Sequence, residues 1–346
     1  RQEAQAQAEA LAAEAAAAAM ALTVGAAWAR YVEERRPHWG ERTHADHVSM
    51  TREGGEKRKR LPGVLTKPGP LAHFMGMRLV DLNAEKVEAW AKAEAKTRPA
   101  RVRLALRLLK AFLRWAAAES DLSNMVDLSA ATAKKAREAA GKAKPKDDVL
   151  ERGQLAAWFK AVQGIANPIA AAYLQTLLLT GARPGEVLTL RWDDLNTQWQ
   201  SITIRDKVEG ERQIPLTPFV WHLLDRLPRR NGWVFSSMRS LSLDAKQIKR
   251  RALRHAAKGT AAPVGDMVPA SASGRLMQPD DPHRKACATA GLEGLTLHGL
   301  RRSFASLTEW LEIPAGVVAQ IQGHKPSPSP NKHYKRRPLD LLRVHH

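Results

Sequence analysis

Apolar residues recur at helical spacing along most of this chain and alternate with polar residues in one short region. Residues 22–128 contain no alternating pattern, so the sequence predicts an all-helical segment there. Between Ser201 and Leu216, two arms with alternating apolar residues flank a turn at Glu209 and Gly210, which predicts a β-hairpin. Helical spacing returns afterwards. We therefore expect a mainly α-helical protein with a small antiparallel β-sheet.

The clearest amphipathic helix is expected over residues 99–120. At 100° per residue, its basic side chains fall on a stripe roughly 60° wide, opposite an apolar arc. The apolar arc holds Val102, Ala105, Leu109, Phe112 and Leu113. The basic stripe holds Arg103, Arg107, Lys110 and Arg114. No acid precedes Glu119 to form i,i+4 ion pairs with this stripe, which favours a face that meets phosphate over an ordinary solvated face.

The charge of the chain indicates a polyanionic partner. Lys and Arg number 55 against 35 Asp and Glu, which gives a formal net charge of +20, and the isoelectric point is near 10.4. Because the positive residues form runs and stripes, we expect a nucleic acid to be this partner. No apolar stretch of about 20 residues exists to span a bilayer, so no membrane partner is expected. Further candidate DNA contacts are Lys57, Arg58, Lys59, Arg60, Lys142 and Lys144.

Cysteine and histidine spacing gives no sign of a metal centre. Cys287 is the only cysteine, which excludes an intrachain disulfide and a thiolate-rich zinc site and fits a reducing cytosol. His44 and His47 have i,i+3 spacing but no further ligands nearby, so an ordinary helix face is the better interpretation. We expect neither a metal nor a cofactor.

Composition divides the chain into four parts. Residues 1–21, mostly Ala, Glu and Gln, predict a helical linker, and the missing initiator Met suggests that a longer protein precedes it. Residues 22–128 are expected to form a helical DNA-binding domain. Residues 129–149 are expected to form an exposed basic linker, since Gly141 and Pro145 lie among five lysines. Residues 150–346, which contain the hairpin, are expected to form a second, α+β domain.

Six polar residues of the second domain occur in an order that suits phosphoryl transfer without metal. They are Arg183, Lys207, His298, Arg301, His324 and Tyr334. Taken singly, each motif is weak, because a second His-x-x-Arg match begins at His333. The surroundings strengthen the case. Arg183 follows Thr180 and Gly181 in a turn beside Glu186, and Lys207 is the only lysine between Arg183 and Lys246.

These motifs resemble those of the tyrosine recombinase, or phage integrase, family. That family has an arginine in a Thr-Gly-x-Arg turn, a lysine in a β-hairpin, a His-x-x-Arg box, a Gly-His pair and a tyrosine nucleophile, and all five occur here in order. The chain's ending is similar to integrases of prophages and genomic islands. The resemblance implies a helical core-binding domain over residues 22–128 and a recombinase catalytic domain over residues 150–346. It also implies a DNA strand-transferase that integrates or excises a mobile element through a 3′-phosphotyrosyl intermediate.

In this interpretation each candidate residue has a chemical role. Arg183 and Arg301 would each donate hydrogen bonds to non-bridging oxygens of the scissile phosphate, and His324 would add a third donor. Lys207 would protonate the leaving 5′ oxygen, and His298 would accept the proton of the Tyr334 phenol. The resemblance also implies double-stranded DNA attachment sites as the partner and a homotetramer on that DNA. It further implies accessory DNA-bending or excision factors, and a bacterial, nucleoid-associated location in the cytoplasm.

Other interpretations stay open at this point. A type IB topoisomerase uses similar catalytic logic but relaxes supercoils as a monomer, and a non-cleaving DNA-binding or architectural factor would need none of the six residues. Arg183 could pair structurally with Glu186, His298 and His324 could cap helix ends, and Lys207 could be solvated. Polar neighbours argue against Tyr334 as a core aromatic. A C-terminal cluster, Leu339, Leu341 and Leu342, could dock on a neighbouring copy or pack within its own domain.

Overall fold

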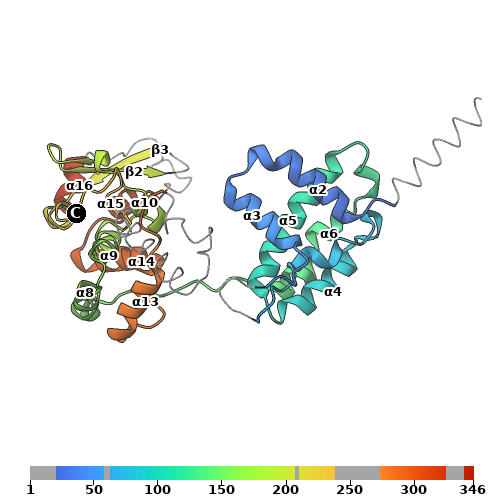
Figure 1. Cartoon of the computed structure of the whole chain (residues 1–346), viewed down its shortest axis with the longest axis horizontal. Helices are drawn as coiled ribbons and strands as arrows, with labels where there is room; N and C mark the ends of the chain where they lie inside the picture. The colour runs from blue at the N-terminus through green and yellow to red at the C-terminus, as the bar shows by residue number, and fades with distance from the viewer. Residues whose placement is uncertain (1–20, 58–62, 207–209, 238–272, 325–338) are drawn as a thin grey trace, which may run out of the picture. The chain divides into compact units, whose positions relative to one another are not determined.

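A computed structural model describes residues 21–57, 63–206, 210–237, 273–324 and 339–346. The chain divides into two compact units between Pro145 and Lys146. Helices make up most of both units, and the strands of the described residues form one small antiparallel sheet in the second unit (Figure 1). The expected fold class is therefore confirmed. Among the helices that these residues form, none combines the length and apolar character needed to cross a bilayer.

The first unit is built around one long helix, α5 (Pro99–Ala118). Its other helices are α2 (Val24–Arg35), α3 (Glu41–Thr51), α4 (Ala84–Ala95), α6 (Leu128–Thr132) and α7 (Lys134–Ala140). Short 3₁₀ turns lie between them, namely η1 (Arg36–His38), η2 (Pro70–Phe74), η3 (Leu79–Asp81) and η4 (Ser123–Met125). The whole predicted apolar arc of α5 is buried, and α5 contacts α2, α4, α6 and α7. The amphipathic pattern therefore predicted this helix correctly to within two residues at its C-terminal end.

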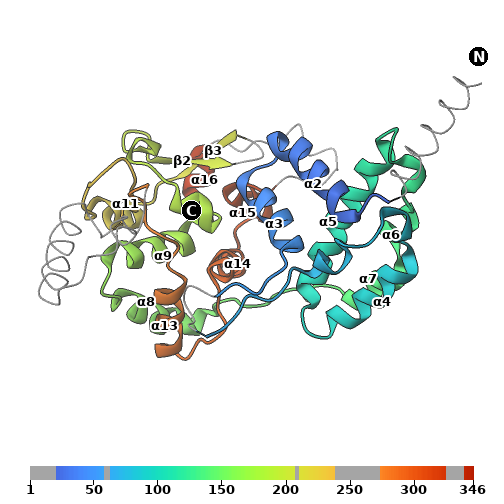
Figure 2. The same ribbon diagram turned by 45° about the vertical axis from the view of Figure 1, so that its right-hand side comes forward.

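The expected linker over residues 129–149 is wrong for its first half. Helices α6 and α7 occupy residues 128–140 apart from Ala133, and α7 packs along α4 (Figure 2). Four alanines, Ala130, Ala133, Ala136 and Ala140, are buried in the core of the first unit. Alanine contributes little apolar area, so a helix that packs through alanines has no strong periodic signal. Within residues 129–149, the longest run of exposed residues is 141–147, and it begins at Gly141 with a φ of 65°.

His47, one of the two spaced histidines, belongs to an aromatic core. It is 2% exposed, and its ring stacks on Trp39 with 3.9 Å between centroids. Its Nδ1 lies 2.8 Å from the Thr43 carbonyl oxygen, and its Nε2 lies 3.4 Å from the Tyr31 hydroxyl. Both ring nitrogens therefore have partners within the fold, and the helix-face interpretation is replaced by a packing role.

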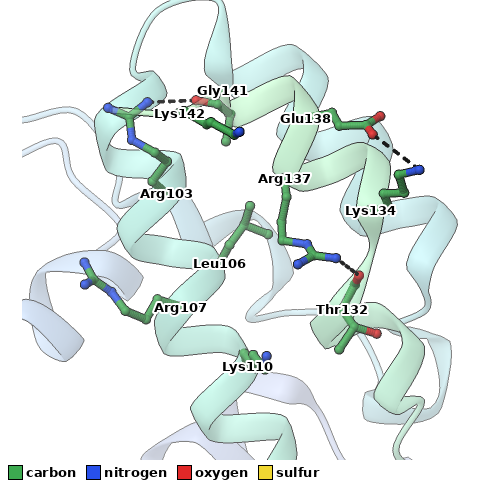
Figure 3. A pocket seen from close by; sticks show the side chains of 11 residues that line it. Arg103, Leu106, Arg107, Lys110, Thr132, Lys134, Arg137, Glu138, Gly141 and Lys142 are labelled. Carbon is green, nitrogen blue, oxygen red and sulfur yellow. Dashed lines mark hydrogen bonds and ion pairs between the residues drawn. The ribbon is translucent and has the colours of Figure 1, made fainter. Parts of the chain in front are cut away.

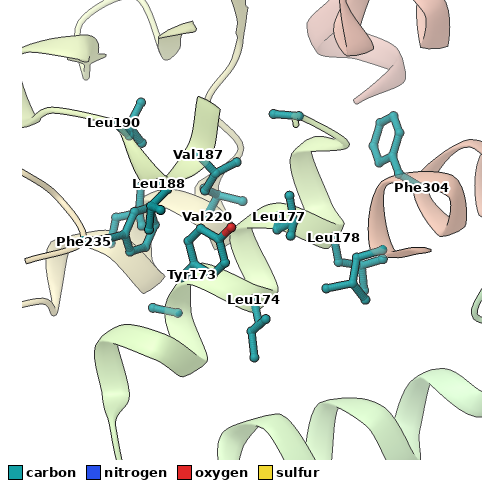
Figure 4. Close-up of a cluster of buried hydrophobic side chains, with 14 of the residues drawn as sticks. Tyr173, Leu174, Leu177, Leu178, Val187, Leu188, Leu190, Val220, Phe235 and Phe304 are labelled. Carbon is teal, nitrogen blue, oxygen red and sulfur yellow. The ribbon is translucent and has the colours of Figure 1, made fainter. Parts of the chain in front are cut away.

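The second unit surrounds the buried helix α9 (Pro168–Thr180). The other helices that the described residues of this unit form are α8 (Leu155–Gln163), α10 (Pro184–Leu188), α11 (Pro218–Asp225), α13 (Asp280–Thr289), α14 (Leu297–Thr308), α15 (Ala315–Gln322) and α16 (Leu339–His345). Figure 4 shows Tyr173 of α9 inside this core, where it meets Phe235 edge to face at 5.4 Å. The Tyr173 hydroxyl donates to the Pro184 carbonyl at 2.9 Å, which fixes the start of α10 against α9.

The sheet contains β1 (Leu195–Asn196), β2 (Ser201–Asp206) and β3 (Gly210–Pro215), in that order and antiparallel. Ile202 pairs with Ile214, and Ile204 pairs with Arg212. The predicted hairpin is therefore confirmed in its two arms, whereas its tip, residues 207–209, lies outside the described residues.

The last helix, α16, packs against β3 and α15 of its own unit. Leu342 is 1% exposed within the main core, and the His346 ring lies 2.8 Å from the Leu179 carbonyl oxygen. Leu341 is 42% exposed. Packing within the same unit is therefore observed for Leu342.

Candidate active site

The turn between α9 and α10 places Arg183. Gly181 ends α9 in the left-handed conformation, with φ at 58°, and Arg183 precedes the first residue of α10. The Arg183 backbone N–H donates to Glu186 Oε2 at 2.8 Å, and its Nη1 donates to Glu186 Oε1 at 2.7 Å. The side chain of Arg183 is 41% exposed, whereas that of Glu186 is 9% exposed. The expected structural pair with Glu186 therefore exists, and it orients a guanidinium that still reaches solvent.

Arg301 joins α14 to this turn. It lies one helical turn after His298 and is 8% exposed. Its Nη1 donates to the Gly181 carbonyl at 2.7 Å, and its own backbone carbonyl accepts from Gln322 Nε2 at 2.8 Å. Arg301 therefore fixes three elements together, namely the α9–α10 turn, α14 and the end of α15.

His324 follows α15 directly. Gly323 ends that helix with a φ of 67°, and the His324 backbone N–H donates to the Ala319 carbonyl at 2.9 Å. Burial lowers the pKa of His324, and the positive charges of Arg301, Arg183 and Arg212 lower it further. A neutral imidazole therefore lies among three guanidinium groups from three separate parts of the sequence.

His298 lies at the head of α14, and its side chain is exposed. Its pKa is lowered by partial burial and then by the charges of Arg302, Arg301 and Lys146, against an opposing effect of Asp148. The imidazole is therefore neutral at pH 7 and can accept a proton.

Asp148 fixes the head of α14. Its Oδ2 accepts hydrogen bonds from the Thr296 backbone N–H at 2.8 Å and from the Thr296 hydroxyl at 2.6 Å. Its Oδ1 accepts from the Arg302 guanidinium. A side chain at Gly299 would lie 2.6 Å from Asp148 Oδ2, so the close approach requires glycine there. Thr296 also caps α14, because its hydroxyl accepts from the Gly299 N–H at 3.0 Å.

Four of the six predicted residues lie in the described part of the chain, and the structure groups them around the ends of α10, α14 and α15. They are Arg183, His298, Arg301 and His324. Lys207 and Tyr334 lie outside the described residues, so their assignment stays a prediction from the sequence.

Sequence reasoning missed Arg212 and Asp148. Arg212 donates to Glu186 Oε2 at 2.8 Å and to the Ile321 carbonyl at 3.2 Å. One signal for Arg212 was available, because Arg212 and Ile214 share a face of β3 and Ile214 is buried. A cation at a core-facing position of a strand has to find a partner. Asp148 gave no comparable local signal.

A basic groove of about 720 Å³ lies in the first unit (Figure 3). Its cations are Arg103, Arg107, Lys110, Lys134, Arg137 and Lys142, which come from α5, α7 and the segment after α7. Among the described residues, Glu138 is the one carboxylate that lines the groove, and it lies 3.9 Å from Lys134 Nζ. Three residues of the predicted basic stripe thus share the groove with α7, a helix that was not expected.

The other candidate DNA contacts lie elsewhere in the first unit or outside the described residues. Arg114, Lys57 and Lys144 are exposed and do not line the groove. Arg58, Lys59 and Arg60 fall outside the described residues.

The single cysteine is not part of the candidate site. Cys287 is 2% exposed on α13, and its sulfur lies 3.2 Å from His283 Nε2. Burial raises the pKa of the Cys287 thiol to about 11 and lowers the pKa of His283 to about 4. Because both groups are neutral at pH 7, this pair has neither the thiolate nor the imidazolium of a cysteine nucleophile.

Comparison with known proteins gives matches over both units. Residues 23–138 match the phage integrase core-binding domain, and residues 149–337 match the phage integrase family. Prophage integrase IntF of Escherichia coli (strain K12) is 39% identical over 344 residues, which cover 94% of this chain and 66% of that protein. The chain thus spans less than two thirds of the length of this relative.

Two solved structures have a similar fold. A lambda integrase tetramer bound to a Holliday junction matches with a TM-score of 0.57 and 16% identity, over 91% of this chain and 80% of that one. A lambda integrase dimer bound to a COC′ core site matches with a TM-score of 0.58 and 16% identity, over 90% of this chain and 77% of that one.

Proposed function

Because this chain belongs to the phage integrase family, we propose that it is a site-specific DNA recombinase that cleaves and rejoins strands through a 3′-phosphotyrosyl intermediate. Its biological role would be to integrate or excise a mobile element. The observation that carries the proposal is the convergence of Arg183, Arg301 and His324, which are far apart in sequence, at one place.

The two arginines supply the charge that a phosphate transition state needs. A guanidinium presents five N–H donors in a planar fork that matches two phosphate oxygens. Glu186 orients Arg183, and the Gly181 carbonyl orients Arg301. Neither guanidinium group therefore has to change its orientation when DNA binds. Each donor that stabilises the developing charge lowers the barrier by about 3 kcal/mol, by comparison with oxyanion holes.

The proton transfers follow from the ionisation states of the side chains. The Tyr334 phenol loses its proton to neutral His298, its oxygen forms a bond to phosphorus, and the bond from phosphorus to the 5′ oxygen breaks. The Lys207 ammonium gives a proton to that leaving oxygen. Neutral His324 donates its N–H to a non-bridging oxygen. The phosphotyrosyl bond conserves the energy of the phosphodiester, so the reverse attack by a 5′ hydroxyl rejoins the strand.

The DNA duplex is the proposed partner, bound in part by the basic groove of the first unit. Six cations against one carboxylate give this groove a strongly positive field. A homotetramer on two duplex sites, assisted by DNA-bending or excision factors in a bacterial cytoplasm, completes the proposal. A lambda integrase of similar fold forms a tetramer on a Holliday junction.

A covalent-trapping experiment tests the proposal. Nicked duplexes tiled across the DNA that flanks the coding sequence are incubated with the chain, because a nick lets the cleaved fragment escape and traps the adduct. One duplex should yield a protein–DNA adduct that resists detergent, and Tyr334→Phe should abolish it. An adduct that survives Tyr334→Phe would refute the nucleophile assignment. No adduct on any duplex would favour a non-cleaving DNA-binding factor, and relaxation of plasmids without the site would favour a topoisomerase.

A further inference from the structure

Arg212 of β3 holds together the elements that present Arg183 and His324. We propose that Arg212 is a positioning residue for DNA cleavage, which ties the β2–β3 hairpin to the start of α10 and to the end of α15. This inference rests on the proposed recombinase function. Arg212 contacts Glu186 and the last turn of α15, and it acts on Arg183 and His324 through them.

The contacts of Arg212 reach two separate elements. Its Nη2 donates to Glu186 Oε2 at 2.8 Å, and its Nη1 lies 3.3 Å from Glu186 Oε1. Its Nε donates to the Ile321 carbonyl at 3.2 Å, in the last turn of α15. The Arg212 side chain is 14% exposed and that of Glu186 is 9% exposed, so this fork is shielded from water on most sides.

Glu186 is shared between two guanidinium groups. It accepts from Arg183 through Oε1 and from the Arg183 backbone N–H through Oε2, while Arg212 approaches both of its oxygens. The pKa of Glu186 is held below its ordinary value by these bonds, although burial opposes them. A carboxylate with a single partner can move together with that partner. Because Glu186 is held from two sides, it restricts the positions of both guanidinium groups. Arg212 therefore limits where the Arg183 guanidinium can lie.

The backbone before His324 closes directly onto the Arg212 guanidinium. A side-chain carbon at Gly323 would lie 2.8 Å from Arg212 Cζ, which is closer than such atoms approach. Gly323 also has a φ of 67° and accepts from Arg183 Nη2 at 3.4 Å. The turn that presents His324 is thus packed against Arg212 with no room between them, and a shift of Arg212 is transmitted to His324.

Arg212 also lies on β3, the strand that follows Lys207 in the sequence. It pairs with Ile204 of β2 and follows Lys207 by five residues in sequence. The Arg212 side chain therefore fixes β3 to the start of α10, next to Arg183, and to the end of α15, next to His324. A lysine at position 212 would keep the charge but lack the planar fork, so it could not hold Glu186 and Ile321 at the same time.

The test compares Arg212→Gln and Arg212→Lys with the unchanged chain, and uses Arg284→Gln as the control. Arg284 is an exposed arginine of α13 with an i,i+3 partner, so its loss removes one positive charge away from the site. The first measurement is the single-turnover rate of adduct formation on the nicked duplex that traps the unchanged chain. Arg212→Gln should slow this rate about 100-fold, because small misplacements of reacting groups cost about that much. Arg212→Lys should recover about a tenth of the original rate, and Arg284→Gln should stay within twofold.

The second measurement is the pKa of His324, read by NMR in the protein without DNA and assigned with His324→Gln. Arg212→Gln removes one of the charges that lower this pKa, so the pKa should rise toward its ordinary value, while Arg284→Gln should leave it unchanged. A general loss of folding would not move this pKa selectively. If no duplex traps the unchanged chain, the recombinase proposal fails, and the NMR titration still decides whether Arg212 governs the surroundings of His324.

Two results would overturn the inference. One is an Arg212→Gln chain with cleavage rate within twofold of the unchanged chain, and the other is an unaltered His324 pKa. If Arg212→Gln does not fold because the shielded Glu186 loses one of its two guanidinium partners, the double variant with Glu186→Gln removes both charges. The double variant should cleave more slowly than Glu186→Gln alone, because it also loses the bond from Arg212 to the Ile321 carbonyl. Equal rates for the double variant and Glu186→Gln would contradict the tie between Arg212 and the end of α15.

Discussion

Replacement of Asp148 by asparagine removes one charge from the head of α14 with almost no change in shape. Asp148 accepts two hydrogen bonds from Thr296 and one from Arg302, and its side chain is 14% exposed. An asparagine can keep its oxygen toward Thr296, but it then turns an N–H₂ group toward the Arg302 guanidinium. The variant therefore loses the charged partner of Arg302 and weakens the bonds to Thr296.

The expected loss of stability is about 2 kcal/mol. A hydrogen bond to a charged group contributes about 1.5–3 kcal/mol, and the lower part of this range applies because Arg302 is 35% exposed and can turn to water. For a unit of this size, about 2 kcal/mol lowers the melting temperature by about 4–8 °C.

The loss should depend on pH in a defined direction. Burial alone would raise the pKa of Asp148, but the bonds from Thr296 and Arg302 outweigh burial and hold the pKa below its ordinary value. The stabilisation by Asp148 is therefore complete above the unfolded pKa, near 4, and is lost as the pH falls through the lower pKa of the folded state. The difference between the two proteins should shrink below about pH 4.

Urea unfolding at several pH values measures both effects, and Asp147→Asn is the matched control. Asp147 is the adjacent residue, is exposed, and loses the same charge in that substitution. Asp147→Asn should leave the unfolding free energy within about 0.5 kcal/mol. Equal unfolding midpoints for the two variants at pH 7 would refute the anchoring role of Asp148.

Three further outcomes are expected. Gly181→Ala should destabilise the second unit by about 2–3 kcal/mol in urea unfolding, because the added carbon would lie 2.4 Å from the Phe304 ring at a φ of 58°; a loss below about 0.5 kcal/mol would show that the turn relaxes freely. In the folded protein His283 has a pKa of about 4, whereas an unfolded histidine binds its proton near pH 6.5. As the pH falls from about 6.5 to about 4, the free energy of unfolding should therefore decrease by up to about 3 kcal/mol. His283→Gln should flatten this dependence on pH, and an unchanged dependence would contradict the assignment. Arg107→Gln in the basic groove should reduce the slope of log affinity for duplex DNA against log salt by about one, whereas Arg78→Gln, which pairs with Asp81 in the same unit, should not.

The parts of the fold that the sequence predicted are those determined by local pattern. Helix α5 and the arms β2 and β3 have strong periods of 3.6 and 2, and both lie where the pattern placed them. Helix α7 gives no strong periodic signal because alanines form its buried face, and the lysines around it are typical of a linker. Composition is a weaker guide than periodicity where the buried side chains are small.

The order of the site motifs could be recognised in the sequence, but the contacts that hold the site residues in place could not. Thr296 meets Asp148 across 148 residues, and Arg212 meets Ile321 across 109. No periodicity links residues at such distances, and one chain contains many acids and arginines that could pair. The resemblance supplied the residues that would act on DNA, whereas their supports became visible only in the packed structure.

The buried Cys287 makes the chain suitable for spectroscopic labelling. With the only native thiol 2% exposed and protonated at neutral pH, a maleimide dye would react with a cysteine introduced at the surface and leave α13 untouched. Asp147→Cys offers such a position, and a second cysteine on α5 would allow energy transfer to report the distance between the two units. No native residue would first have to be removed.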